Sequence, residues 1–196
     1  MQNNQVTKAI KKRQSVRSYL DIPIPDNDLS SILEAGLYAP SGKNRQPWRF
    51  LIIKDVDIIK TIAKSTVYSR FSRNAPIMVL MFAKQDTSYP LEKDMIGIGA
   101  CLQNILLAAT EKEYGSCIIG ELYGRQNELS EHLKLDCKDY LLVCGITLGK
   151  MKLVSKDTRE KIDIVKLNAE IKEIVAHEQV LRDEIDKIIA EIEVDA

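Results

Sequence analysis

The chain has 196 residues, of which 45% are hydrophobic, and its 28 Lys or Arg residues balance 28 Asp or Glu residues. This length and composition predict one ordinary globular domain with a substantial core. A formal net charge of zero gives no basic excess for nucleic acid or an anionic membrane. Any anion-binding site must therefore be a local cluster.

The N-terminal sequence MQNNQVTKAIKKRQ lacks the apolar region of a signal peptide, and no later window approaches eighteen uninterrupted apolar residues. We therefore expect a cytoplasmic protein with no membrane partner. Its four cysteines form no CxxC pair and are expected to be buried thiols. The two histidines lie in charged, helix-like segments, so a metal site is not expected.

In the first half of the chain, apolar periodicity predicts helices and short apolar strands, with irregular structure over 65–74. The helices are expected at 4–13, 26–37 and 56–63, and the strands at 50–53, which should be buried, and 76–83.

The second half should begin with a helix from about Leu91 to Tyr114, ended by Gly115. This helix is apolar nearly all round, which predicts cover on both sides, either within the chain or at a subunit interface. A strand running into a turn is expected over 116–122, a short helix over 125–135, and a central strand over 139–148. Such an alternation of helices and strands predicts an α+β or α/β sandwich.

Two polar runs are candidates for ligand binding. If the chain is extended after the first helix, Arg13, Ser15 and Arg17 face the same side and can bind phosphate and a polar ring edge. The alternative is a solvated basic patch. The loop 39–50 offers small hydrogen-bonding groups and the cations Lys43, Arg45 and Arg49, which suit a planar, partly anionic ligand. The alternative there is an ordinary surface turn.

These runs, Arg-x-Ser-x-Arg at 13–17 and Pro-Ser-x-x-Asn-x-Gln-Pro-Trp-x-Phe at 40–50, resemble those of the nitroreductase-like flavoproteins, and so does the helix that contains Asp94. The resemblance covers about residues 4–165. It implies an α+β three-layer sandwich with a central, mainly antiparallel sheet flanked by helices. It also implies bound FMN and a homodimer with two FMN sites at its interface.

The resemblance further assigns individual roles. Arg13 would meet the FMN phosphate, Ser15 the ribityl chain, and Arg17 the N1/O2 edge of the ring. A backbone N–H near Gly120 and Glu121 would approach N5, and Arg159, with Lys156 behind it, would be a second phosphate ligand. The full set of implied cofactor-binding residues is Arg13, Gln14, Ser15, Arg17, Ser41, Asn44, Gln46, Gly120, Glu121, Lys156 and Arg159. Trp48 is expected in the core below the loop rather than on the flavin.

No nucleophile or acid–base set stands out, so the reactive atoms of an enzyme would belong to a cofactor. The resemblance implies an oxidoreductase that passes electrons from NAD(P)H to an electron-poor acceptor such as a nitroaromatic or a quinone. The alternatives are a flavin-binding or partner-binding protein without turnover, and other flavin chemistry such as reductive dehalogenation or flavin fragmentation.

The C-terminal segment departs from the compact members of that family. Residues 166–194 carry apolar residues at alternating spacings of three and four, which predicts a helix of about 40 Å with an apolar stripe that it cannot bury alone. We expect 1–165 to form the FMN-binding domain and 166–196 a helical extension that packs on the partner subunit.

Overall fold

The computed structural model describes residues 5–86, 88–133, 136–152 and 172–185. The chain divides into two compact units, Met1–Lys156 and Asp157–Ala196. The division that we expected after residue 165 falls outside the described residues. In the second unit, residues 172–185 are helical and their side chains are exposed, which confirms the predicted helix over that stretch.

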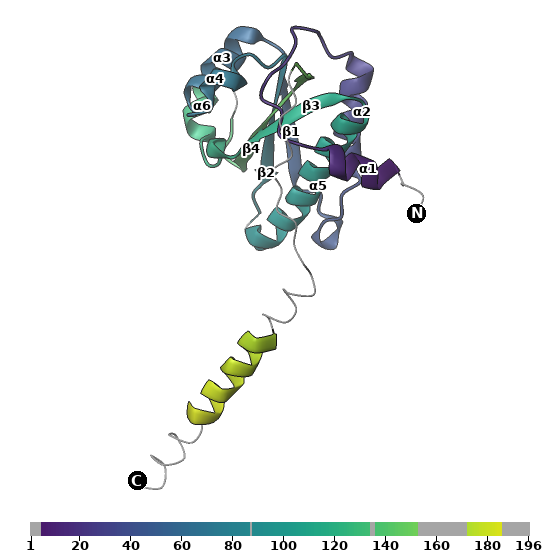
Figure 1. Ribbon diagram of the computed structural model, residues 1–196. Helices are drawn as coiled ribbons and strands as arrows, with labels where there is room; N and C mark the ends of the chain where they lie inside the picture. The colour runs from purple at the N-terminus through teal and green to yellow at the C-terminus, as the bar shows by residue number, and fades with distance from the viewer. Residues whose placement is uncertain (1–4, 87, 134–135, 153–171, 186–196) are drawn as a thin grey trace. The chain divides into compact units, whose positions relative to one another are not determined.

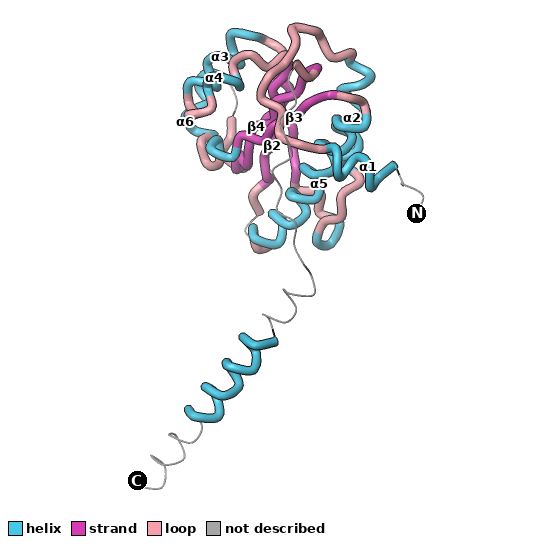
Figure 2. Tube along the Cα trace, in the orientation of Figure 1, coloured by secondary structure: helices cyan, strands magenta, loops and turns pink. Residues whose placement is uncertain are grey.

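The first unit is a sandwich of helices around one sheet (Figures 1 and 2). Its helices are α1 (Gln5–Lys12), α2 (Asp26–Leu37), α3 (Val56–Lys64), α4 (Ser69–Ser72), α5 (Leu91–Glu111) and α6 (Gln126–Leu133), with short 3₁₀ turns η1 (Gly42–Asn44) and η2 (Gly120–Leu122). Its strands are β1 (Trp48–Ile53), β2 (Ile77–Lys84), β3 (Tyr114–Ile119) and β4 (Tyr140–Lys150).

The four strands lie in the order β1-β2-β4-β3, and every neighbouring pair is antiparallel. The central position predicted for the 139–148 strand is confirmed, since β4 pairs with both β2 and β3. In Figure 1, α3, α4 and α6 cover one face of the sheet, and α2 and α5 cover the other. The α+β three-layer sandwich is therefore confirmed.

Side chains alternate between two hydrophobic cores because successive strand residues point to opposite faces of the sheet. The core beneath α2 and α5 contains Ile77, Val79, Met81 and Ala83 of β2, and the core beneath α3 and α6 contains Met78, Leu80 and Phe82. Trp48, only 3% exposed, lies in the first of these cores. The expected location of Trp48 is thus confirmed.

Three predicted boundaries were wrong. The helix α5 ends at Glu111, because Glu113 takes a left-handed φ of 62° and Tyr114 already belongs to β3. Gly115 lies in β3, where an added Cβ would come within 2.6 Å of Val16, so a close approach, not helix termination, requires glycine there. The 65–74 stretch, which we expected to be irregular, contains α4. The strand that we expected to be buried over 50–53 is β1, a partly exposed edge strand that begins at Trp48.

All four cysteines are buried free thiols. Burial raises the pKa of Cys101 and Cys144 to about 12 and also raises the pKa values of Cys117 and Cys137, so none is an activated thiolate near neutral pH. Within the described ranges, no three His, Cys, Asp or Glu side chains lie close enough to hold a metal ion. No helix in the described part of the chain is long and apolar enough to cross a membrane.

Candidate functional site

Backbone and side-chain contacts hold the segment after α1 against the edge strand β3 and its neighbour β4. Ser15 forms a parallel bridge with Ser116 of β3, and the Val16 N–H donates to the Ser116 carbonyl at 2.9 Å. Further along, the buried Tyr19 hydroxyl donates to the Val16 carbonyl at 2.6 Å and lies 2.7 Å from the Thr147 hydroxyl. These contacts fix the backbone that presents Arg13, Ser15 and Arg17.

The three predicted side chains of this run influence the buried Cys117 thiol of β3. Burial raises the pKa of the Cys117 thiol, while Arg17, Ser15 and Arg13 all act to lower it. Each of them therefore lies close enough to β3 to influence the same sulfur. The binding role expected for these residues stays a prediction.

Residues 66–71 bring Arg17 near the turn at the end of β3. The Arg17 guanidinium lies over the Phe71 ring, 5.8 Å from its centroid. The Glu121 carboxylate accepts hydrogen bonds from the Thr66 hydroxyl at 2.6 Å and the Val67 N–H at 3.0 Å. Glu121 therefore anchors η2 to the α3–α4 connection, a structural role that the sequence did not indicate.

Gly120, at the start of that turn, is exposed, and an added Cβ would have no neighbour within 4 Å. The backbone at Gly120 is therefore accessible from outside the protein. Gln14 lies on another side, in a small cavity of about 70 Å³ together with Thr110 at the end of α5.

The loop that holds Ser41, Asn44 and Gln46 has an unusual backbone. Lys43, Asn44 and Gln46 all have positive φ values, of 53°, 54° and 48°. Left-handed conformations cost roughly 1–3 kcal/mol each for residues other than glycine, and less for Asn. Such strain persists only where surrounding contacts impose it, and it is concentrated at functional sites.

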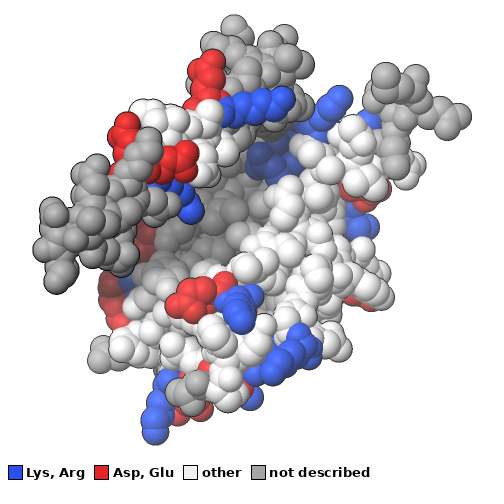
Figure 3. Space-filling view, turned by 90° about the horizontal axis from the view of Figure 1, so that it is seen from below, with Lys and Arg blue, Asp and Glu red and all other residues white. Residues whose placement is uncertain are grey.

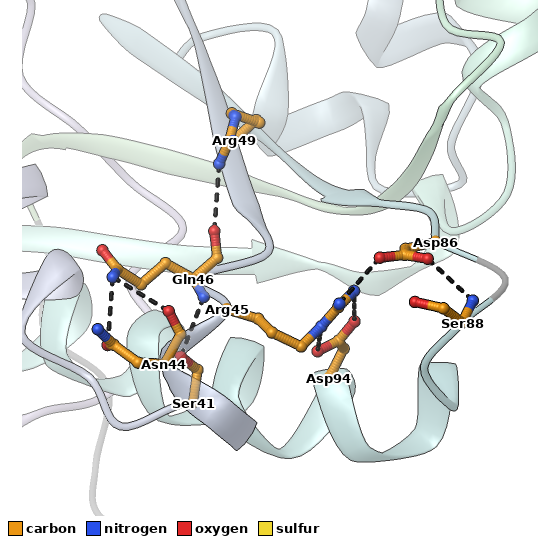
Figure 4. Close-up of polar contacts among 8 residues, drawn as sticks. All are labelled: Ser41, Asn44, Arg45, Gln46, Arg49, Asp86, Ser88 and Asp94. Carbon is orange, nitrogen blue, oxygen red and sulfur yellow. Dashed lines mark hydrogen bonds and ion pairs between the residues drawn. The ribbon is translucent and has the colours of Figure 1, made fainter.

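Hydrogen bonds within the loop join the three predicted residues. The Gln46 N–H donates to the Ser41 hydroxyl at 3.0 Å, and the Gln46 side-chain amide donates to Asn44 Oδ1 at 3.2 Å (Figure 4). Gly42 packs so tightly that an added Cβ would lie 1.9 Å from the Tyr89 hydroxyl. The structure thus brings Ser41, Asn44 and Gln46 into one rigid polar cluster.

Arg45 fastens this loop to the beginning of α5. Its Nε and Nη2 each lie 3.4 Å from an oxygen of the buried Asp94 carboxylate, and its Nη1 lies 2.9 Å from Asp86 (Figure 4). The guanidinium also lies 4.6 Å from the centroid of the Tyr89 ring. Hydrogen bonds from Ser88 and then from Arg45 hold the pKa of Asp86 well below its usual value.

These contacts correct the role expected for the arginines of the loop. Arg45 pairs with two carboxylates, and Arg49 donates to the carbonyls of Gln46 and Trp48 at 3.2 and 2.7 Å. Both arginines therefore hold the loop itself instead of offering free charge to an anion. The sequence analysis missed Asp86 and gave Asp94 no part in this site, since nothing local pairs either of them with Arg45.

The two clusters lie at opposite ends of α5. The loop packs on Gly97, near the start of the helix, where an added Cβ would lie 3.0 Å from the Pro40 carbonyl. Gln14 and Val16 lie beside Thr110, near its end. Gly97 and Thr110 are thirteen positions apart, which corresponds to a rise of about 20 Å along the helix. Within one chain, the Arg13 run and the Ser41 loop therefore pack on different ends of α5.

The last two predicted residues, Lys156 and Arg159, lie outside the described residues, so the second phosphate contact stays a prediction.

Comparison with known proteins places this fold and these runs in one family. The model of the nitroreductase family matches residues 10–69 and 60–150. A protein of Archaeoglobus fulgidus, provisionally named NADH dehydrogenase/NAD(P)H nitroreductase, is 33% identical over 62% of this chain and 70% of its own length. An FMN reductase [NAD(P)H] of Bacillus subtilis is 27% identical over 74% of this chain and 66% of its own.

A solved structure extends the similarity to three dimensions. The crystal structure of a provisionally assigned nitroreductase of Desulfovibrio desulfuricans, in complex with FMN, is 35% identical to this chain. It aligns with a TM-score of 0.74 over 81% of this chain and 93% of that one. The chain belongs to the nitroreductase family.

The anchoring role of Asp94 can be tested by unfolding. We expect Asp94→Leu to lower the free energy of unfolding by roughly 2 kcal/mol, because a buried guanidinium contact is lost while the strained loop remains. Urea denaturation followed by circular dichroism measures this. Asp57→Leu is the control, since the Asp57 carboxylate is exposed and its pair with Lys60 lies on the surface, away from the loop. The anchor is refuted if Asp94→Leu is no more destabilising than this control.

Proposed function

We propose that this protein is an FMN-dependent oxidoreductase that passes electrons from NAD(P)H to a small electron-poor acceptor such as a nitroaromatic or a quinone. The observation that carries the proposal is the pairing of the 13–17 run with β3 through Ser15 and Val16, within a fold whose similar structure from Desulfovibrio desulfuricans contains FMN. Names of the similar proteins, which include an FMN reductase and a nitroreductase, support the same activity.

The donor groups of the 13–17 run and the 41–46 loop fit FMN. A guanidinium suits a phosphate, a hydroxyl suits the ribityl chain, and a second guanidinium suits the polar edge of the ring. The 41–46 loop adds the hydroxyl of Ser41 and the amide of Asn44, which suit the carbonyl and N–H groups of an isoalloxazine. When bound, FMN supplies the redox chemistry that protein side chains do not supply.

The residues of this chain bind and orient the reactants. Arg13 would hold the phosphate end, and Arg17 would place a fixed positive charge at the N1/O2 edge, where it would stabilise negative charge on the ring. Phe71 supports the Arg17 guanidinium from one side, and Glu121 holds the turn at Gly120 against Thr66. Because these contacts exist in the protein alone, little reorganisation is needed when ligands bind.

The first test is spectroscopic. We expect the purified protein to be yellow, to release FMN on denaturation, and to lose its visible absorption when NADH or NADPH is added without oxygen. Addition of a nitroaromatic or a quinone should restore the colour. A colourless protein that takes up no added FMN contradicts the proposal. Bound FMN that no pyridine nucleotide bleaches favours the alternative of a flavin-binding protein without turnover.

We further propose that two copies of the chain build each FMN site. The Arg13 run and the Ser41 loop lie about 20 Å apart along α5, so both contact one FMN only if the loop comes from a second subunit. The exposed surface of α5 supports this arrangement, because Ile96 is 75% exposed and Gly99 faces open space. Seen from below, charged side chains are scattered around a broader uncharged area (Figure 3).

Subunit complementation tests the shared site. Arg13→Ala and Asn44→Ala, each as a homodimer, should bind FMN roughly tenfold or more weakly, because each loses a hydrogen bond to the ligand. A hybrid of the two variants should contain one intact and one doubly altered site. We therefore expect mixing after partial denaturation to restore up to half of the tight FMN binding, measured by fluorescence titration. No recovery in verified hybrids contradicts the shared site.

The exposed helix 172–185 suggests a second contact between subunits. Ile174, Leu181 and Ile185 recur at helical spacing, so the helix carries an apolar stripe that it cannot bury by itself. We propose that the stripe packs on the partner subunit.

Ile174→Glu with Leu181→Glu should then weaken the dimer roughly tenfold or more in sedimentation experiments, since two apolar side chains lose their burial. Lys172→Glu, on the same helix but outside the stripe, is the control for charge. An unchanged dimer in the double variant would assign the stripe to another partner.

We also propose a cytoplasmic location for the protein. The buried thiols agree with a reducing cytoplasm, and cell fractionation can check this location.

A further inference from the structure

A large basic cavity extends from Arg17 and Phe71, and the rest of its lining has no part in the contacts proposed above. Its volume is about 470 Å³, within the range on the order of 300–1,000 Å³ that ligand pockets occupy. It lies where the segment after α1 passes α3, α4 and the end of β4. The lining includes five cationic side chains, namely Arg17, Lys60, Arg70, Arg73 and Lys152.

These cations are poorly neutralised. Asp21 is the one carboxylate in the lining. Lys60 also pairs with the exposed Asp57 at 3.2 Å, whereas Arg70 and Arg73 have no acidic partner among the described residues. Five like charges around one hollow repel each other and attract a multiply charged anion. Phosphate monoesters carry about −1.5 to −2 charges at neutral pH and three acceptor oxygens, which match such a set of donors.

The cavity is separate from the proposed FMN phosphate contact. It is lined by Arg17, Ser18, Tyr19 and Asp21, so it follows the chain away from Arg13, and neither Arg13 nor Ser15 lines it. An FMN molecule with its phosphate at Arg13 and its ring edge at Arg17 would meet the cavity at Arg17, and the other four cations of the lining have no part in the proposed FMN contacts. The anion must come from a second ligand that reaches the flavin edge.

We propose that this cavity binds the 2′-phosphate of NADPH, so that the enzyme uses NADPH in preference to NADH. This inference rests on the proposed function. A dinucleotide whose nicotinamide meets the flavin extends well beyond the ring, and its adenosine end needs a site on the surrounding protein. NADH and NADPH share the pyrophosphate and differ only in the 2′-phosphate. The preference between them therefore measures recognition of that single group.

The test measures both binding and turnover in the FMN-loaded enzyme. Titration calorimetry with NADP⁺, NAD⁺, 2′-AMP and 5′-AMP gives affinities without turnover. The wild type should bind NADP⁺ roughly tenfold or more tightly than NAD⁺, and 2′-AMP more tightly than 5′-AMP. The ratio of kcat/KM for NADPH to that for NADH should show the same preference.

Variants locate the preference in the cavity. Arg70→Ala with Arg73→Ala should lower the NADPH-to-NADH ratio of kcat/KM roughly tenfold. Lys60→Ala should lower it less, because Lys60 already pairs with Asp57. Lys64→Ala is the matched control, since it lies one turn further along α3 and outside the cavity. Raising the salt concentration should also reduce the preference, because these exposed cations are screened.

The outcomes separate this inference from the function on which it rests. Equal binding of NADP⁺ and NAD⁺ by the wild type overturns it, and so does an equal loss of NADH and NADPH activity in the double variant, which would place only the pyrophosphate here. Weaker FMN binding in the double variant also overturns it, since the cavity would then belong to the flavin. In each of these cases, the proposed function stands if NADH or NADPH still reduces the bound FMN.

Discussion

The length of α5 determines which ligand-binding groups of this protein can meet. This 21-residue helix packs against the sheet, the loop before β1 rests on its first turns, and the run after α1 lies beside its last turn. Since a helix is a rigid spacer with a fixed rise per residue, no side-chain rearrangement closes the gap. If one FMN contacts both groups, as proposed above, a complete site needs two chains, and the exposed apolar surface of α5 is available for their association.

The loop of residues 41–46 shows how the protein holds its polar groups ready. Three left-handed residues raise the energy of the loop, and the contacts of Arg45 with Asp94 and of Gly42 with Tyr89 offset that cost. A flexible loop would lose conformational freedom on binding and so weaken the complex. Here the ordering occurs on folding, which leaves Ser41 and Asn44 already positioned for a ligand.

Local patterns in the sequence predicted most of the fold. Apolar periodicity located α2 to the residue, and the two-sided apolar character of β4 marked it as central. The end of α5 was predicted incorrectly because Gly115 looked like a helix terminator, whereas the break depends on the backbone of Glu113. Val16 is distant from Gly115 in sequence but packs against it in the fold. This close contact, which the local sequence does not indicate, is what requires glycine at position 115.

The site was predictable where its residues are adjacent in sequence, as in the run from Arg13 to Arg17. It was not predictable where distant residues meet. The partners Arg45 and Asp94 are 49 positions apart. The basic cavity combines residues from four separate places in the chain, among them Arg17, Arg73 and Lys152. With equal numbers of acidic and basic residues overall, composition conceals such a local excess of charge.

The position of Trp48 has a practical consequence. It is the only tryptophan, it follows the 41–46 loop directly, and it is buried beneath α2 and α5. Its fluorescence therefore comes from a single, known place next to the proposed ligand groups. Emission from this residue overlaps the near-ultraviolet and blue absorption of flavins, so energy transfer would quench it whenever a flavin lies nearby. The native chain thus contains its own optical reporter of cofactor loading, without any label or substitution.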